Sequence, residues 1–139
     1  MPTLPPGDGA GGTSRDPDRE GAERDAERRA VEAMASFRDR ARATNLSRVE
    51  VLEDALALLG GGVLTEDARL TACRTAHTVV GSAGTFGFGE ASRLARRLES
   101  LLHEEDGSEG AHVRAARGLE LVAGLRAALA ETTGPQPTS

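Results

Sequence analysis

No proline occurs between Pro17 and Pro135, and this gap is the strongest constraint on how the chain folds. A proline inside a helix removes a backbone hydrogen bond and clashes with the preceding turn, so long uninterrupted helices need such a stretch. All six prolines stand at the two ends of the chain, where little can be buried. We therefore expect a disordered tail over residues 1–18, one helical domain over 19–133 and a second disordered tail over 134–139.

Apolar residues between the two tails recur at three- and four-residue spacing, which is typical of amphipathic helices. Short polar or glycine-rich segments separate four such stretches, and helices joined by short loops pack antiparallel to one another. The sequence therefore predicts an all-α, antiparallel four-helix bundle in up-down-up-down order. The apolar positions are Val31, Met34, Phe37, Ala41, Val49, Leu52, Leu56 and Leu59; Ala72, Ala76, Val79, Ala83 and Phe86; Ala91, Leu94, Ala95, Leu98, Leu101 and Leu102; and Ala115, Leu119, Val122, Leu125 and Leu129.

Glycines and capping residues predict where these helices begin and end. The first helix ends at the glycines 60–62, and it is either one long helix or two helices that meet near residues 44–45, so that an extra helix precedes the bundle. The second runs from about 65 to 85, with acidic residues in its first turn. The third ends near 106–107, and Ser108 caps the fourth.

The composition excludes several classes of partner and location. The chain has 2% aromatic residues and a net charge of −5, so it lacks the basic surface that nucleic-acid binding requires. Its one cysteine cannot form an internal disulfide, and no apolar run is long enough to cross a bilayer. We expect a cytoplasmic monomer that binds neither nucleic acid nor membrane and carries no metal or cofactor of its own.

His77 stands out on the second predicted helix. With about 100° of rotation per residue, the apolar positions of that helix share one side and His77 lies roughly opposite their centre. Gly81 and Gly84 follow one and two turns later, although glycine in a helix costs up to about 1 kcal/mol relative to alanine. This favours an exposed ridge that another surface approaches closely. Its predicted members are Cys73, Arg74, His77, Val80, Gly81 and Gly84.

An outward histidine next to open space can act as a nucleophile. Imidazole titrates near neutral pH, so one ring nitrogen keeps an available lone pair and can hold a phosphoryl group covalently. In-line transfer brings the donor group to within about 3 to 3.5 Å of that nitrogen. Bulky side chains beside His77 would prevent such an approach, and the two glycines avoid this.

The residues around His77 resemble a known family. The segment Ala76-His77-Thr78-Val79-Val80-Gly81-Ser82-Ala83-Gly84-Thr85-Phe86-Gly87-Phe88, followed by Ser92, Leu94, Ala95, Leu98 and Glu99, is similar to the histidine-containing phosphotransfer (HPt) domains of multistep two-component signalling. The similarity covers about residues 66–102, and the flanking helices agree in length and order. Members of this family are four-helix bundles with an outward histidine.

The resemblance implies a function and a partner. His77 would accept a phosphoryl group from the aspartate of a response-regulator receiver domain, alone or in a hybrid sensor kinase, and pass it on. Gly81 and Gly84 would permit docking, and the turn 85–88 would lead into the next helix. The receiver would bring the divalent metal, so this chain is expected to be a phosphocarrier without kinase or hydrolase activity of its own.

Val80 departs from the family's pattern, in which a lysine usually stands three residues after the histidine. A cation at this position could offset phosphate charge, whereas valine cannot. All seventeen basic residues of the chain are arginines, yet none occupies position 80. Arg74, three residues before His77, is the candidate for the missing charge, unless it is solvated or paired with Glu66 or Asp67. The candidate site therefore consists of His77 as phosphoryl acceptor and of four docking residues, Arg74, Val80, Gly81 and Gly84.

Two other functions stay open. Without the lysine, the domain can be an adaptor that binds receivers but transfers phosphate weakly or not at all. In a different class, the chain is a helical scaffold that dimerises through its first helix. We expect His103 and His112 to be solvated loop residues and assign no role to Cys73.

Overall fold

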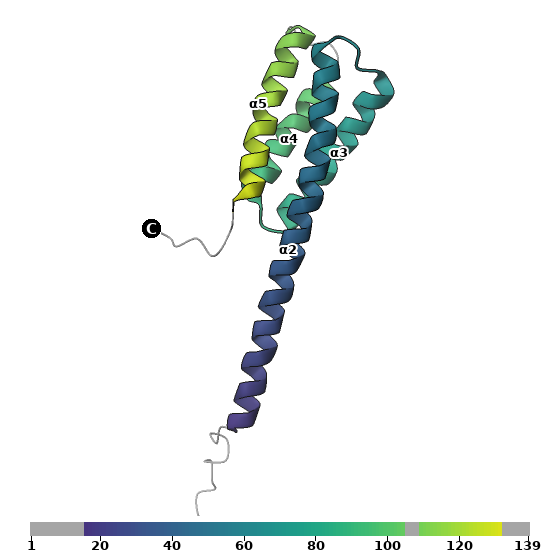
Figure 1. Ribbon diagram of the computed structural model, residues 1–139. Coiled ribbons are helices and arrows are strands. Elements are labelled where there is room, and N and C mark those ends of the chain that lie inside the picture. The colour runs from purple at the N-terminus through teal and green to yellow at the C-terminus, as the bar shows by residue number, and fades with distance from the viewer. Residues whose placement is uncertain (1–15, 105–108, 132–139) are drawn as a thin grey trace, which may run out of the picture. The chain divides into compact units, whose positions relative to one another are not determined.

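The computed structural model describes residues 16–104 and 109–131. Over these ranges the chain forms four α-helices and no strand, which confirms the predicted all-α class (Figure 1). Contacts divide the chain into two units, residues 1–36 and 37–139. The helices are α2 (Pro17–Gly60), α3 (Glu66–Thr85), α4 (Gly89–His103) and α5 (Ala111–Ala130).

The unit that starts at Phe37 contains the bundle. Its four helical segments run up, down, up and down, each antiparallel to the one before, as predicted (Figure 1). Gly62 and Gly87 stand in the connections before α3 and α4 with positive φ angles of 72° and 85°, which glycine adopts without strain. Leucine, valine and alanine side chains from all four helices form one core.

Of the two alternatives for the first helix, the structure has one long helix, α2, over Pro17–Gly60. It passes residues 44–45 without a break, and the buried Asn45 has hydrogen-bond partners inside the fold. Its side-chain amide donates to Oγ of Ser82 at 3.1 Å, and its carbonyl accepts from Arg48 at 2.8 Å. A polar side chain with these partners does not need water and does not interrupt the helix. The predicted tails 1–18 and 134–139 lie outside the described residues except for 16–18, and there the predicted boundary was wrong, because Pro17 and Asp18 already belong to α2.

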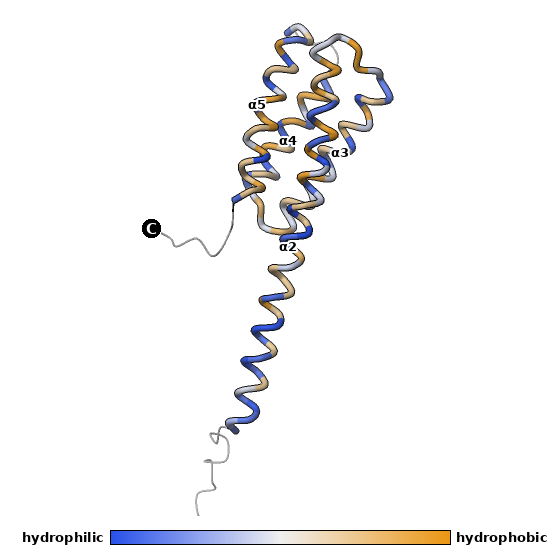
Figure 2. The backbone as a smooth tube through the Cα atoms, in the orientation of Figure 1, coloured by the Kyte–Doolittle hydropathy of each residue, from blue (hydrophilic) through white to orange (hydrophobic). Residues whose placement is uncertain are grey.

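The apolar spacing near the start of α2 does not mark buried residues. Val31, Met34 and Phe37 are 69%, 55% and 46% exposed, and Ala41 is the first of these positions to be buried. Figure 2 shows mainly hydrophilic and pale segments along residues 17–36, whereas hydrophobic segments recur through the bundle. None of the described helices combines the length and apolar character needed to span a membrane.

The packing of α5 against α2 corrects one predicted core position. Gly118 is buried, and a Cβ atom there would overlap the side chain of Leu56 on α2. The buried face of α5 therefore passes through Gly118, and the neighbouring Leu119, which was expected in the core, is 41% exposed. The periodic pattern missed this because glycine does not count as an apolar residue.

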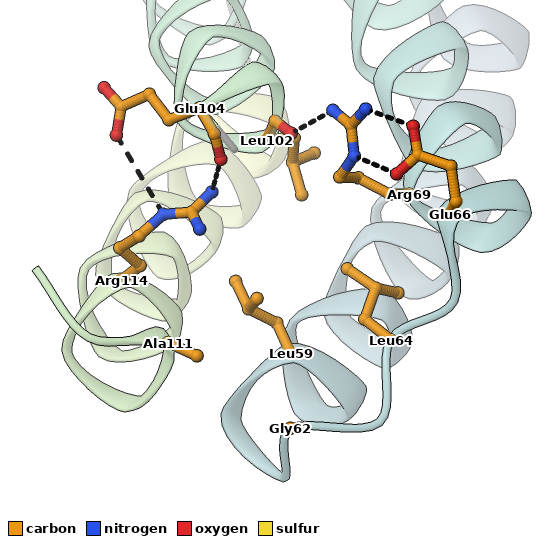
Figure 3. Close-up of a pocket in the computed structure, with 9 residues that line it drawn as sticks. All are labelled: Leu59, Gly62, Leu64, Glu66, Arg69, Leu102, Glu104, Ala111 and Arg114. Carbon is orange, nitrogen blue, oxygen red and sulfur yellow. Dashed lines mark hydrogen bonds and ion pairs between the residues drawn. The ribbon is translucent and has the colours of Figure 1, made fainter. Parts of the chain in front are cut away.

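Two arginines bond to the carbonyl groups at the C-terminal end of α4. The last carbonyl groups of a helix have no partner within it, and cations there also interact well with the helix dipole. The side chain of Arg69 donates to the carbonyl of Leu102 at 2.9 Å, and that of Arg114 donates to the carbonyls of Leu101, at 2.7 Å, and Glu104. Figure 3 shows Arg69 and Arg114 reaching α4 from two sides of a pocket at this end of the bundle.

The boundaries of α4 and α5 accordingly differ from the predicted ones. α4 ends at His103 rather than near 106–107, and α5 begins at Ala111 after Gly110. Ser108, the predicted cap, lies outside the described residues. His103 and His112 were expected in a loop, and this was wrong: they are the last residue of α4 and the second residue of α5.

Candidate functional site

Helix α3 carries His77 and turns it outward. The helix starts where the side chain of Thr65 accepts a hydrogen bond from the backbone N–H of Ala68 at 3.1 Å. Its buried residues include four of the five predicted apolar positions, and the side chain of His77 is 75% exposed. The outward orientation predicted from helical period is therefore what the structure has. The four buried positions are Ala72, Ala76, Val79 and Ala83.

Glu99 on α4 holds one nitrogen of this imidazole. Nδ1 of His77 lies 3.1 Å from Oε2 and 3.4 Å from Oε1 of Glu99, whose side chain is 22% exposed. An ionised carboxylate only accepts hydrogen bonds, so the contact favours the tautomer with the proton on Nδ1. Nε2 then carries the free lone pair.

A shallow hollow of about 390 Å³ lies around this contact, between α3 and α4. His103 lines the same hollow, and its Nε2 lies 3.9 Å from Oε2 of Glu99. Sequence reasoning missed both residues of α4. The four-residue spacing of Glu99 and His103 places them on one helix face, but only packing against α3 brings that face to His77. The hollow is lined by Leu70, Cys73, Arg74, His77, Thr78, Glu99 and His103.

Two predicted neighbours of His77 are not on the outward ridge. Cys73 is only 4% exposed, and burial raises the pKa of its thiol. Val80 is half-buried and packs against the core, and its carbonyl accepts a hydrogen bond from Ser92 on α4 at 2.8 Å. Both residues lie on the flank of α3 that α4 covers. Cys73 still borders the hollow around His77, whereas Val80 does not.

Arg74 is on the open flank. It is exposed, lines the hollow with His77, and has a weak hydrogen bond of 3.4 Å to the hydroxyl of Thr71. Glu66, one of the two alternative partners, instead accepts hydrogen bonds from Arg69: Nη2 donates to Oε1 at 2.5 Å and Nε donates to Oε2 at 2.9 Å. These hydrogen bonds lower the pKa of the Glu66 carboxyl. Over residues 16–104 and 109–131, no ion pair of Arg74 is found.

The two glycines leave open surface after His77. Both are exposed. A Cβ atom at Gly81 would meet no other atom within 4 Å, and one at Gly84 would be in ordinary contact with Oγ of Ser92 at 3.4 Å. Packing within the domain therefore does not require glycine at either position, although glycine weakens the helix.

The threonine hydroxyls of α3 near His77 bond to their own helix. The hydroxyl of Thr78 donates to the carbonyl of Arg74 at 3.0 Å, and that of Thr75 donates to the carbonyl of Thr71 at 2.9 Å. In the part of the chain that the structure describes, no group of three or more histidine, cysteine or acidic side chains is arranged to hold a metal ion. The polar groups of the hollow that remain available are those of Arg74, His77, Glu99 and His103.

Comparison with known proteins identifies the family. A family model described as the Hpt domain matches residues 22–132, which is most of the chain and includes the whole hollow. No curated protein and no solved structure matches the chain significantly. With its helical bundle and outward histidine, the chain belongs to the Hpt domain family, whose members transfer phosphoryl groups in phosphorelay signalling.

Proposed function

We propose that His77 is the phosphoryl acceptor of this domain, and that it takes the group from the aspartyl phosphate of a receiver domain and passes it on. The observation that carries the proposal is the contact between Nδ1 of His77 and Glu99 on an otherwise open ridge. Receivers and kinases are the partners of Hpt domains in general. The choice of His77, and of a receiver aspartate as donor, is specific to this proposal.

The tautomer assigns the chemistry to Nε2. Glu99 keeps the proton on Nδ1, so the lone pair of Nε2 attacks phosphorus in line with the bond that breaks. The Nε2–P bond forms, the P–O bond to the receiver's aspartate breaks, and the aspartate leaves as a carboxylate. The imidazole gains positive charge as it attacks, and the Glu99 carboxylate, 3.1 Å from Nδ1, offsets that charge. Transfer to the next receiver is the same step in reverse.

Access and charge come from the open flank of α3. Gly81 and Gly84 add no side chain above the ridge, so a partner can bring its reacting oxygens close to Nε2. Arg74 is the cation of the hollow that keeps its charge at any pH near neutral, and we assign to it the neutralisation of phosphate charge. Val80 cannot do this, and a lysine in its place would start from a half-buried position on the covered flank.

Transfer from a phosphorylated receiver tests the proposal. The purified protein should acquire phosphate that is labile in acid and stable in base, and the His77→Gln variant should acquire none. His112→Gln is a matched control, because His112 is also exposed but lies on α5, away from the hollow. Phosphate on the His77→Gln variant would contradict the assignment.

The same experiment separates the two other functions. An adaptor, which the absence of a cation at Val80 favours, would bind receivers with measurable affinity and take up no phosphate. A scaffold would bind no receiver and would self-associate through α2, whose first part exposes Val31 and Met34. The phosphocarrier requires binding and transfer together.

A further inference from the structure

The Glu99 carboxylate has an imidazole on each side. Its Oε2 lies 3.1 Å from Nδ1 of His77 and 3.9 Å from Nε2 of His103. Glu99 and His103 are one turn apart on α4, and all three side chains line the hollow between α3 and α4. One carboxylate is therefore shared between the proposed phosphoryl acceptor and a second histidine.

We propose that His103 is a positioning residue that acts on His77 through Glu99. Neutral His103 leaves the carboxylate to His77, whereas protonated His103 attracts the carboxylate and loosens its contact with Nδ1. This inference rests on the proposed function of His77. It adds a form of regulation to that function: the protonation state of His103 changes the fraction of His77 in the tautomer that can attack phosphorus.

The consequence for His77 follows from its tautomer. Free neutral imidazole of histidine carries its proton on either nitrogen, and the Glu99 contact selects Nδ1. When Glu99 is drawn towards His103, the tautomer with the proton on Nε2 gains population, and that tautomer has no lone pair on Nε2, the nitrogen that attacks phosphorus. Protonated His103 thus slows transfer without touching the phosphoryl group.

The groups around His103 belong to α4 and α3. His103 is in the last turn of α4, where the helix dipole attracts a positive charge. From α3, Cys73 and Arg74 face the hollow: the thiol of Cys73 is buried, and the charge of Arg74 does not change near neutral pH. His103 is 58% exposed, so solvent screens its attraction to Glu99, and we expect an effect of about two-fold on the transfer rate.

Two variants of the full chain bracket the protonation states of His103. His103→Gln removes the charge at every pH, and His103→Arg keeps it at every pH. Nitrogen-15 NMR of the imidazoles at pH 8.5 reports which ring nitrogen of His77 is protonated. We expect Nδ1 in the wild type and in His103→Gln, and a larger share of Nε2 protonation in His103→Arg. The same tautomer ratio in both variants would overturn the proposal.

Phosphorylation by phosphoramidate, a small donor that needs no docking, gives the second readout. The rate of the wild type relative to His103→Gln should be about one at pH 8.5 and fall to about one half near pH 6. Both His103 substitutions should lose their effect in a Glu99→Gln background, because the coupling passes through the carboxylate. An undiminished effect there would mean that His103 acts on His77 directly, which contradicts the proposal. If no variant is phosphorylated, the proposed function fails, while the tautomer ratio still decides the role of His103.

Discussion

Gly81 offers a test in which stability and function change in opposite directions. It lies inside α3, four residues after His77, and a Cβ atom there would meet nothing within 4 Å. Alanine is better than glycine in a helix interior by about 0.8 to 1.0 kcal/mol. Since nothing in the domain opposes the gain, Gly81→Ala should stabilise the protein by about that amount and raise its Tm by about 4 °C.

A larger side chain at the same place should impair docking. Leucine is also a good helix former, so the Gly81→Leu variant should fold at least as stably as the wild type. Its side chain would stand on the ridge beside His77, where the partner's surface must come within contact distance of Nε2. Overpacking at a close contact costs about 1 to 3 kcal/mol, which corresponds to a transfer rate about five-fold to 150-fold below wild type.

Two donors and one matched control make the outcome decisive. Transfer from a phosphorylated receiver should be slow in Gly81→Leu, whereas phosphorylation by phosphoramidate should stay within about two-fold of wild type. A Cβ atom at Gly21 in α2 would likewise meet nothing within 4 Å, so Gly21→Leu should leave both rates unchanged. A Gly81→Leu variant that accepts phosphate from the receiver at the wild-type rate would refute the idea that Gly81 makes room for a partner.

Three further predictions follow from other parts of the structure. Arg74→Gln should slow transfer from the receiver about five-fold and weaken its dependence on salt, and Val80→Lys should not restore the rate, because position 80 lies on the covered flank of α3. Restoration by Val80→Lys would show that the two flanks are equivalent. Gly118→Ala should destabilise the protein by about 1 to 2 kcal/mol in urea unfolding, since overlap with Leu56 outweighs the gain in helix propensity; an unchanged midpoint would mean that α2 and α5 move apart at no cost. Burial raises the pKa of Cys73, so the reactive thiolate is scarce at pH 8, and iodoacetamide should alkylate the folded protein at least about ten-fold more slowly than the urea-unfolded chain. Equal alkylation rates would place the thiol at the surface.

The orientation of His77 was predictable because it depends on one helix alone. α3 is unbroken from Glu66 to Thr85, so a rotation of about 100° per residue separates its apolar face from its outward face. The number and order of the helices were predictable for a related reason, since proline, glycine and apolar spacing act locally. These features need no knowledge of how the helices cross.

Which side chains on the two flanks of the ridge are exposed depends on how the helices cross, and the prediction for these side chains was partly wrong. Cys73 and Val80 lie about 40° and 60° to one side of His77, and Arg74 and Gly81 lie about 60° and 40° to the other. The sequence treats the two sides alike. Because α4 covers only the first, Cys73 is buried and Val80 half-buried, while Arg74 and Gly81 remain exposed.

The contact of Glu99 with His77 could not be predicted from local sequence patterns. It is 22 residues from His77, on the next helix, and it reaches the imidazole only in the packed bundle. Glu99 belongs to the segment that resembles HPt domains, but no residue next to it in the sequence distinguished it from the other acidic residues of the chain. A rule that connects residues on facing helices would have been needed to find it.

The threonine hydroxyls that bond to their own helix affect how long a phosphoryl group can dwell on His77. Hydrolysis is faster where a side chain activates water beside the phosphorus. The hydroxyl of Thr78 is engaged with the carbonyl of Arg74, and Glu99, the nearest described carboxylate, contacts Nδ1, the ring nitrogen that does not hold phosphorus. Of the described groups of the hollow that could act as a base on that water, His103 remains, and it lies 3.9 Å from Glu99. Few groups therefore assist loss of phosphate to water, which lengthens the time that a carrier has to meet its next partner.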